Sequence, residues 1–169
     1  MIRVQKVAFP SESRLHQELA LATFHDAFEA NLADPSLSAL EIAIRYMRAT
    51  PDWVEALLHV RNRMVAPLGL RDSGAMGALG DRPASAYAVG DSLGLFTIQA
   101  IAPDELVLSA DDKHADVRVA FLKRRHGECC AYVIASWVRT RNVLGRLYML
   151  PVGRIHPLVV KAGMQALVI

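Results

Sequence analysis

Few features of this sequence assign a function by themselves. Its only two cysteines, Cys129 and Cys130, are adjacent, so neither a disulfide framework nor a cysteine metal pair is expected, and a reducing, cytoplasmic setting fits best. No stretch reaches the roughly 18–20 uncharged apolar residues of a membrane span. A nucleotide fingerprint is also lacking, because the glycines between positions 71 and 94 follow no strand and precede no Gly-Lys-Ser/Thr step. We therefore predict no cofactor, no metal and no membrane span.

Acidic residues are absent after Glu128. The basic residues that remain in this part are Arg139, Arg141, Arg146, Arg154 and Lys161. Such an asymmetry can mark a surface for an anionic ligand, nucleic acid or acidic lipid. Because these cations are spaced apart and only Trp137 lies near them, we favour their placement on the water-facing side of a terminal helix. No nucleic-acid partner is predicted.

The length and composition are typical of one globular domain. The chain has 169 residues, of which 53% are apolar and 21% charged, which suffices for a core without disulfides or metals. We expect a single domain over residues 1–169, with an irregular lead-in at 1–18. A long, glycine-punctuated loop at 71–92 is a candidate lid.

Four strand-like runs joined by tight turns form the centre of the sequence. The runs are Leu93–Ile101, Glu105–Asp111, Ala115–Lys123 and Cys129–Arg139. Links this short require antiparallel neighbours, because a parallel return needs a crossover of about a dozen residues or more. The last run is apolar on both faces, so the helices should cover one face and a second layer, such as a subunit partner, the other.

A further strand is expected within Leu19–Leu32. Alternation there puts Phe24, Asp26 and Phe28 on one face. Asp26 is thus a carboxylate in phase with two phenylalanines. A buried acid must be paired or protonated, and the alternative is that this end of the strand is exposed.

Two short helices should follow this strand, and a long helix should end the chain. Asp34-Pro35-Ser36 and Thr50-Pro51-Asp52 are typical openings of short helices. From Asn142 the apolar spacing is helical again, but Pro151 should kink the terminal helix or divide it in two. The inner stripe of the second short helix is expected to be Trp53, Leu57, Val60 and Met64.

Several segments are distinctive when taken together. They are Asp26-Ala27-Phe28, Leu68-Gly69-Leu70, Asp111 to Val119, and Asn142 to His156 with its Gly145-Arg146-Leu147-Tyr148. These segments look like a bacterial family of unknown function, over most of the chain from about residue 20. The order strand, two short helices, meander, long helix resembles the helix-grip fold of the START and polyketide-cyclase superfamily. The resemblance implies an α+β fold in which a curved antiparallel sheet wraps the kinked terminal helix, often around an apolar ligand.

The strongest polar cluster lies at the entry to the third run. Its members are Asp111, Asp112, His114, Asp116 and Arg118. A histidine beside carboxylates could act as a general base, and His114 with Asp116 could hold a divalent metal. We favour a structural role, because Asp-Asp-Lys is ordinary turn chemistry and alternating charges on a strand form solvated pairs of little energy.

A second candidate set lies where the last run enters the terminal helix. Its members are Trp137, Arg139, Arg146 and Tyr148. An arginine with aromatic neighbours can hold a carboxylate or phosphate head group. The favoured alternative is a structural corner whose arginine binds carbonyl groups. Asp26 and Phe28 complete the predicted ligand-binding residues.

These observations predict a module that binds a small apolar or amphipathic molecule between the sheet and the terminal helix. We favour this over an enzyme. One alternative is a cyclase- or hydrolase-type enzyme that uses Asp26 or His114 as an acid or base. The other is an oligomeric interaction protein, a homo-oligomer, without an open pocket.

Overall fold

The computed structural model describes residues 3–65, 79, 81–127 and 129–167. Its centre is a seven-stranded sheet in the order β1-β2-β7-β6-β5-β4-β3. All neighbouring strands pair antiparallel, which confirms the predicted meander. The strands are β1 (Gln5–Lys6), β2 (Phe24–Leu32), β3 (Ser92–Leu93), β4 (Phe96–Ile101), β5 (Glu105–Asp111), β6 (Ala115–His126) and β7 (Cys129–Thr140).

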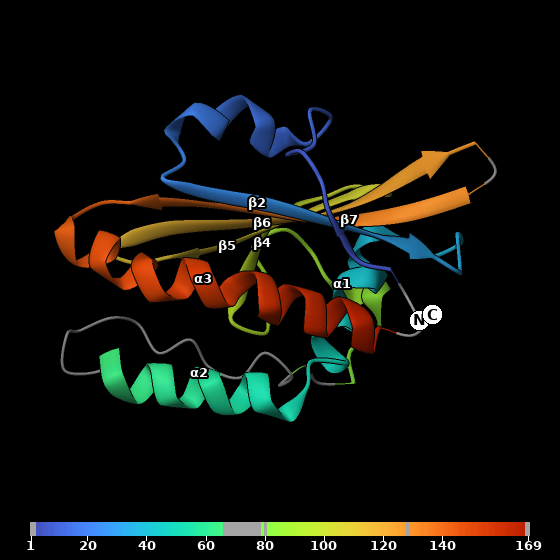
Figure 1. Cartoon of the computed structure of the whole chain (residues 1–169). Coiled ribbons are helices and arrows are strands. Elements are labelled where there is room, and N and C mark those ends of the chain that lie inside the picture. The colour runs from blue at the N-terminus through green and yellow to red at the C-terminus, as the bar shows by residue number, and fades with distance from the viewer. Residues whose placement is uncertain (1–2, 66–78, 80, 128, 168–169) are drawn as a thin grey trace.

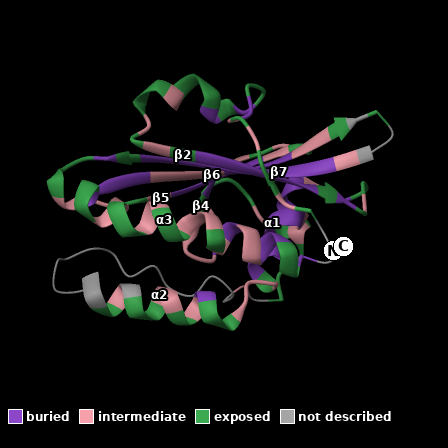
Figure 2. Cartoon of the chain, viewed as in Figure 1, coloured by how far each residue is buried: buried purple, intermediate pink, exposed green. Residues whose placement is uncertain are grey.

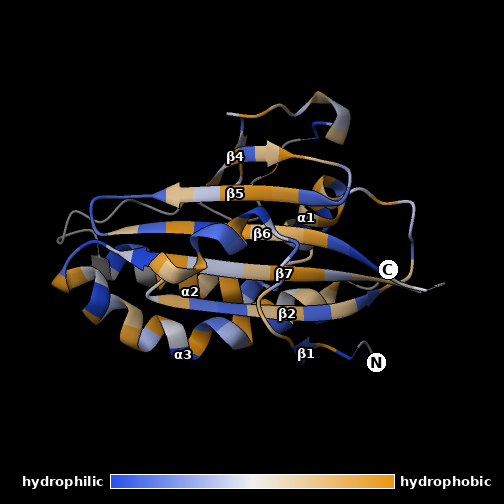
Figure 3. Ribbon diagram, turned by 90° about the horizontal axis from the view of Figure 1, so that it is seen from above, coloured by the Kyte–Doolittle hydropathy of each residue, from blue (hydrophilic) through white to orange (hydrophobic). Residues whose placement is uncertain are grey.

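The helices lie on both sides of this sheet. They are α1 (Ala39–Arg48), α2 (Asp52–Val65), α3 (Val143–Ala166) and the 3-10 helices η1 (Arg14–Leu21) and η3 (Ala84–Ala86). Figure 1 shows α3 crossing one face of the curved sheet, with η1 on the opposite face. Figure 3 shows the strands side by side from β4 to β1, with α1, α2 and α3 beneath them. This is the α+β, helix-grip arrangement that the sequence predicts.

The terminal helix α3 is one continuous helix of 24 residues rather than two pieces. Pro151 and Pro157 both lie inside it. Pro151 lies on the exposed side, so water can bond to the carbonyl group of Leu147, which loses its helical partner. The helix begins at a side-chain cap, in which the Gly145 amide donates to Asn142 Oδ1 at 2.9 Å.

Helix α1 follows its N-cap residue Ser38, whose hydroxyl group and backbone form a reciprocal capping box with Glu41.

The apolar inner stripe predicted for α2 is wrong. Trp53 and Val60 are 49% and 56% exposed, whereas Val54 is buried. Helix α2 lies beyond α3 from the sheet (Figure 1), and among its described side chains only Val54 is buried. The side chain of Met64 lies outside the described part of the chain.

The chain itself covers the second face of the sheet. Leu15 of η1 packs there with Trp137 of β7 and with small residues of the central strands. The indole Nε1 of Trp137 donates to the Glu18 carbonyl oxygen at 3.0 Å. Residues 3–18, expected to be irregular, therefore contain β1 and part of η1, and the strand expected from Leu19 begins at Phe24. No subunit partner is needed to cover this face.

The larger core lies between the sheet, α1 and the C-terminal half of α3. Its largest fully buried side chains include Phe28, Met47, Phe121 and Tyr132. Figure 2 shows the buried middle of the strands and the exposed outer sides of the helices. Of the predicted loop at 71–92, only residue 79 and residues 81–92 are described, and they include η3. The rest of that candidate lid lies outside the described residues.

Candidate functional site

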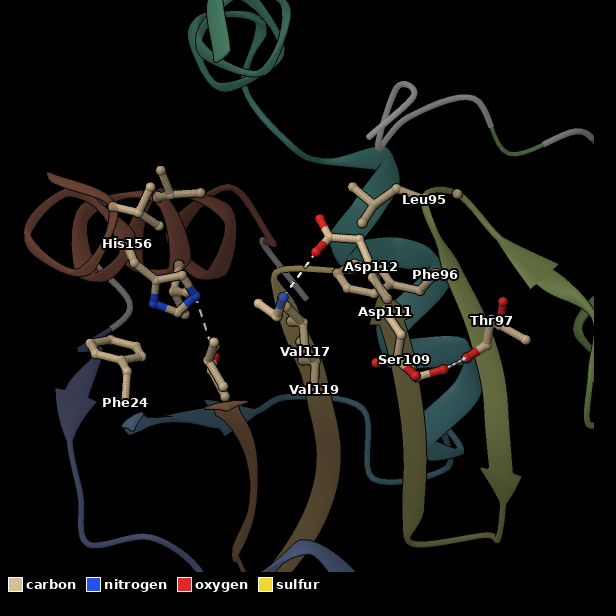
Figure 4. A pocket seen from close by; sticks show the side chains of 18 of the residues that line it. Phe24, Leu95, Phe96, Thr97, Ser109, Asp111, Asp112, Val117, Val119 and His156 are labelled. Atoms are coloured by element: carbon tan, nitrogen blue, oxygen red, sulfur yellow. Dashed lines mark hydrogen bonds between the residues drawn. The ribbon is translucent and has the colours of Figure 1, made fainter. Parts of the chain in front are cut away.

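A cavity of about 680 Å³ lies between the sheet and α3. Its volume falls within the range of roughly 300–1,000 Å³ that is typical of small-molecule sites. Strand alternation points every second residue of β6 and β7 into this space. Apolar side chains form most of its walls, among them Phe24, Leu95, Phe96, Val117, Val119 and Ile134 (Figure 4).

Two polar residues of the cavity wall, Ser136 and His156, meet a third, Asp26, behind that wall. Asp26 and Ser136 occupy directly opposite positions of β2 and β7, and His156 of α3 lies over them. Asp26 Oδ2 is 2.9 Å from His156 Nδ1, and Ser136 Oγ is 3.4 Å from His156 Nε2. Because an ionised carboxylate only accepts hydrogen bonds, Nδ1 is the nitrogen that donates to Asp26, and in a neutral imidazole the lone pair is then on Nε2.

The carboxylate of Asp26 is buried but only partly hydrogen bonded. Its side chain is 2% exposed, and its Oδ1 has no hydrogen-bond partner among the described residues. A buried polar atom without a partner costs free energy. The bond to His156 is the one polar contact that the described residues give this buried carboxylate.

The neighbours of His156 fix the position of its ring. Phe24 contacts the imidazole edge to face, with ring centroids 5.7 Å apart. A Cβ atom at Gly153, one turn earlier on α3, would lie 3.3 Å from the Phe24 ring. The small residue thus leaves room for the phenylalanine that supports the histidine.

The charges around the cavity are acidic rather than basic. No lysine or arginine lines the described part of its wall, whereas Asp112 does. His114 and His156 are the only potential cations among these lining residues. Such a lining disfavours a phosphate or carboxylate head group, which arginine and lysine normally bind.

His114 lines the same cavity, but its contacts are those of a structural corner. Its ring Nδ1 lies 3.2 Å from Asn142 Oδ1, and its carbonyl oxygen accepts from the Arg141 amide at 2.7 Å. A Cβ atom at Gly145 would collide with that carbonyl oxygen. Asp112 completes the corner, because its Oδ1 accepts from the amides of His114 and Ala115. The corner thus ties the start of α3 to β6.

Asp116 faces the opposite side of the sheet, with 2% of its side chain exposed. Arg139 and Arg141 hydrogen bond to its two carboxylate oxygens. Burial alone would raise the pKa of Asp116, but these two guanidinium groups outweigh burial and hold the pKa below its ordinary value. Arg118 pairs with Asp111. In the described residues, no group of three histidine, cysteine, aspartate or glutamate side chains could hold a metal ion.

The structure does not gather the second predicted set. Trp137 lies in the core on the η1 side, and Arg139 pairs with Asp116. Arg146 is exposed on α3, whereas Tyr148 lines the cavity. The ligand-binding roles assigned to these residues, and to Phe28 in the core under α3, stay predictions.

Comparison with known families places this fold in a described group. Residues 19–163 match the family model "Protein of unknown function (DUF2867)". The chain belongs to the DUF2867 family. Neither the curated proteins nor the solved structures gave a significant match. The link to the START and polyketide-cyclase superfamily and the bacterial origin stay predictions. Among the described residues of this DUF2867 protein, no helix is long and apolar enough to cross a membrane.

Sequence reasoning singled out Asp26 but missed His156 and Ser136. The signal for His156 was present, because it shares a helical stripe with Met149, Val152 and Val160. A histidine in an apolar helical stripe is by itself only weak evidence of a functional site. Its carboxylate partner lies 130 residues away in the sequence, and only the fold brings the two together.

Proposed function

We propose that this protein binds a small, uncharged or cationic amphipathic molecule in the cavity between the sheet and α3. One observation carries the proposal: a space of about 680 Å³ with mostly apolar walls and a few convergent polar groups. The same observation makes an oligomeric protein with a closed pocket the less favoured alternative.

The charge of the lining supports the exclusion of anions. Asp112 in the wall and Asp26 behind His156 contribute negative charge, and no basic side chain of the described wall offsets it. An anionic head group would lose its hydration shell without gaining a strong partner. An uncharged ligand with a hydroxyl or carbonyl group can instead bond to Ser136 and His156.

Binding can be tested with the neutral fluorophore Nile red, together with mass spectrometry of the protein under native and denaturing conditions. We expect saturable binding of the dye and competition by neutral or cationic amphipaths, but none by fatty-acid anions of similar size. Val117→Trp should weaken dye binding by roughly tenfold or more, because the larger ring fills the cavity.

Val143→Trp is the matched control, because Val143 is 68% exposed on α3. It should leave the affinity for Nile red unchanged. A folded protein that binds neither Nile red nor any neutral or cationic competitor, and that carries no small molecule after purification, would contradict the proposal.

A second candidate function, an acid–base enzyme, is favoured by one contact. His156 in the cavity wall is hydrogen bonded to the buried carboxylate of Asp26. This is the arrangement of a general base and its orienting acid. His114, the other predicted acid or base, is supported less because its ring bonds to Asn142 at the corner.

A further inference from the structure

We propose that His156 and Ser136 form a proton-transfer centre for a bound carbonyl compound, with Asp26 as the residue that positions the imidazole. The ligand is an uncharged, mostly apolar ketone or related compound with a hydrogen on the carbon next to its carbonyl group. This inference rests on the proposed function, because the compound has to enter the cavity.

The contacts of the imidazole leave one of its two nitrogen atoms available to a ligand. Nδ1 lies 2.9 Å from Asp26 Oδ2 and donates to it, so that in the neutral imidazole Nε2 is the basic atom. The only described partner of Nε2 is Ser136 Oγ, at 3.4 Å. That separation is longer than a good hydrogen bond, so a ligand can displace this contact at little cost.

Ser136 places a hydrogen-bond donor beside the imidazole base. The hydroxyl group of Ser136 can turn from Nε2 and donate to a ligand oxygen. A carbonyl oxygen and the hydrogen on the adjacent carbon lie on neighbouring atoms, so a single small group can meet Ser136 and His156 together. An amine or simple alcohol would use only one of the two.

The chemical step is balanced without a further reactant. The Nε2 lone pair takes a proton from the carbon, the electron pair of that C–H bond forms the C=C bond, and the π pair of the C=O bond moves onto the oxygen to give an enolate. The oxygen accepts a hydrogen bond from Ser136 as its negative charge develops. Return of the proton to the same carbon exchanges hydrogen, and return to a conjugated position moves a double bond.

The order serine, histidine, aspartate is also that of hydrolases that form acyl-enzymes, but the backbone around Ser136 argues against that chemistry. Ser136 lies inside the ladders that pair β7 with β2 and β6. The amides beside it are therefore used by the sheet, and none of the described ones is free to bind an oxyanion as such hydrolases require.

The test uses 2-tetralone, a neutral bicyclic ketone with an acidic C–H group, in D2O. Deuterium uptake is followed by mass spectrometry, and binding of the ketone is measured separately by displacement of Nile red. We expect wild-type protein to speed the exchange on the order of 100-fold over buffer, as general acid–base catalysis does. His156→Gln should return the rate to background while the ketone still displaces the dye.

Two further variants separate positioning from folding. Ser136→Ala should slow exchange at saturating ketone with little change in the half-saturating concentration. Asp26→Asn should do the same, and the 15N NMR signals of the His156 ring should lose the Nδ1–H tautomer. His25→Gln, at an exposed position of β2, is the control and should exchange like wild type.

The outcomes distinguish the two proposals. Failure of 2-tetralone and Nile red to bind at all would overturn the proposed function. Binding without accelerated exchange, or exchange that survives His156→Gln, would overturn the proton-transfer centre and leave the binding site. Turnover of p-nitrophenyl acetate with acylation of Ser136 would replace proton transfer with hydrolysis.

Discussion

Two buried aspartates lie on opposite faces of one sheet, and their surroundings differ. Asp116 faces the η1 side, where arginines bond to both of its oxygens. Asp26 faces α3 and the cavity, with one bond to His156 and one oxygen without a described partner. A fully paired carboxylate can be explained by stability alone. The partly paired one lies next to the cavity, and it is the one to which the proposals above assign a role.

The two faces differ in packing in the same way. On the η1 side, the N-terminal segment closes over small residues and Trp137. On the α3 side, the sheet and helix leave a cavity. Strand alternation thus gives one sheet a solid face and a hollow face, and the following substitutions test that difference.

The largest effect is expected at the solid face. Trp137→Ala should lower the free energy of unfolding by about 3–5 kcal/mol, because it removes a side chain that is only 2% exposed. Trp53→Ala, at a half-exposed position of α2, should change it by less than about 1 kcal/mol. Urea denaturation measures both, and equal losses would contradict the packing described for the η1 side.

A smaller loss is expected where α3 is anchored to the sheet. Gly145→Ala should cost about 1–3 kcal/mol, because the methyl group collides with the His114 carbonyl oxygen. At Gly153 the same change meets only the edge of the Phe24 ring, and alanine favours a helix. Gly153→Ala should therefore be close to neutral in thermal unfolding. A larger loss of stability in Gly153→Ala than in Gly145→Ala would refute the close contact between Gly145 and the His114 carbonyl group.

Asp116→Asn should lower the free energy of unfolding at pH 7 by about 1–2 kcal/mol, through weaker hydrogen bonds to Arg139 and Arg141. Because the pKa of Asp116 is held below its ordinary value, its carboxylate contributes stability at neutral pH. That contribution should be lost as the pH falls from about 4 through the lower value in the folded protein.

The role of the Asp116 carboxylate can be checked by comparing how the stability of two variants depends on pH. Asp116→Asn should flatten the fall in stability in acid, measured by urea denaturation from pH 7 to 3. Asp104→Asn, at an exposed turn, should retain the fall. An unchanged acid profile in Asp116→Asn would mean that the arginine pairs do not contribute in solution.

The smallest stability effect is expected at Asp26. Asp26→Asn should change the free energy of unfolding by less than about 1 kcal/mol in either direction, because the lost charge was poorly compensated. Its effect on deuterium exchange of 2-tetralone should nevertheless be large. A loss of stability as great as that of Trp137→Ala would assign Asp26 to the structure rather than to the site.

The sequence predicted the parts of the fold that depend on local chemistry. Turns such as Asp112-Lys113-His114 require antiparallel neighbours, and alternation placed Asp26 on the face of Phe24 and Phe28. The cover of the other face was not predictable, because packing rather than periodicity decides that η1 lies there. The prediction of the buried stripe of α2 was wrong for a related reason, since a partly covered helix can bury either of two adjacent apolar sides.

The site was predictable only in part. A carboxylate in phase with phenylalanines marked Asp26, but its role depends on His156, which approaches from the far end of the chain. The charged cluster at residues 111–118 looked like one site in the sequence. In the structure, His114 lines the cavity whereas Asp116 faces the opposite side of the sheet, because His114 lies in the turn before β6, where strand alternation does not apply.

The most direct test of the account is a crystal structure of the protein with 2-tetralone. We expect the ketone between Val117 and the Asp26–His156 pair, with its oxygen within hydrogen-bonding distance of Ser136 Oγ and its acidic carbon next to His156 Nε2. An empty cavity at saturating ketone, or a ketone bound only elsewhere on the protein, would contradict it.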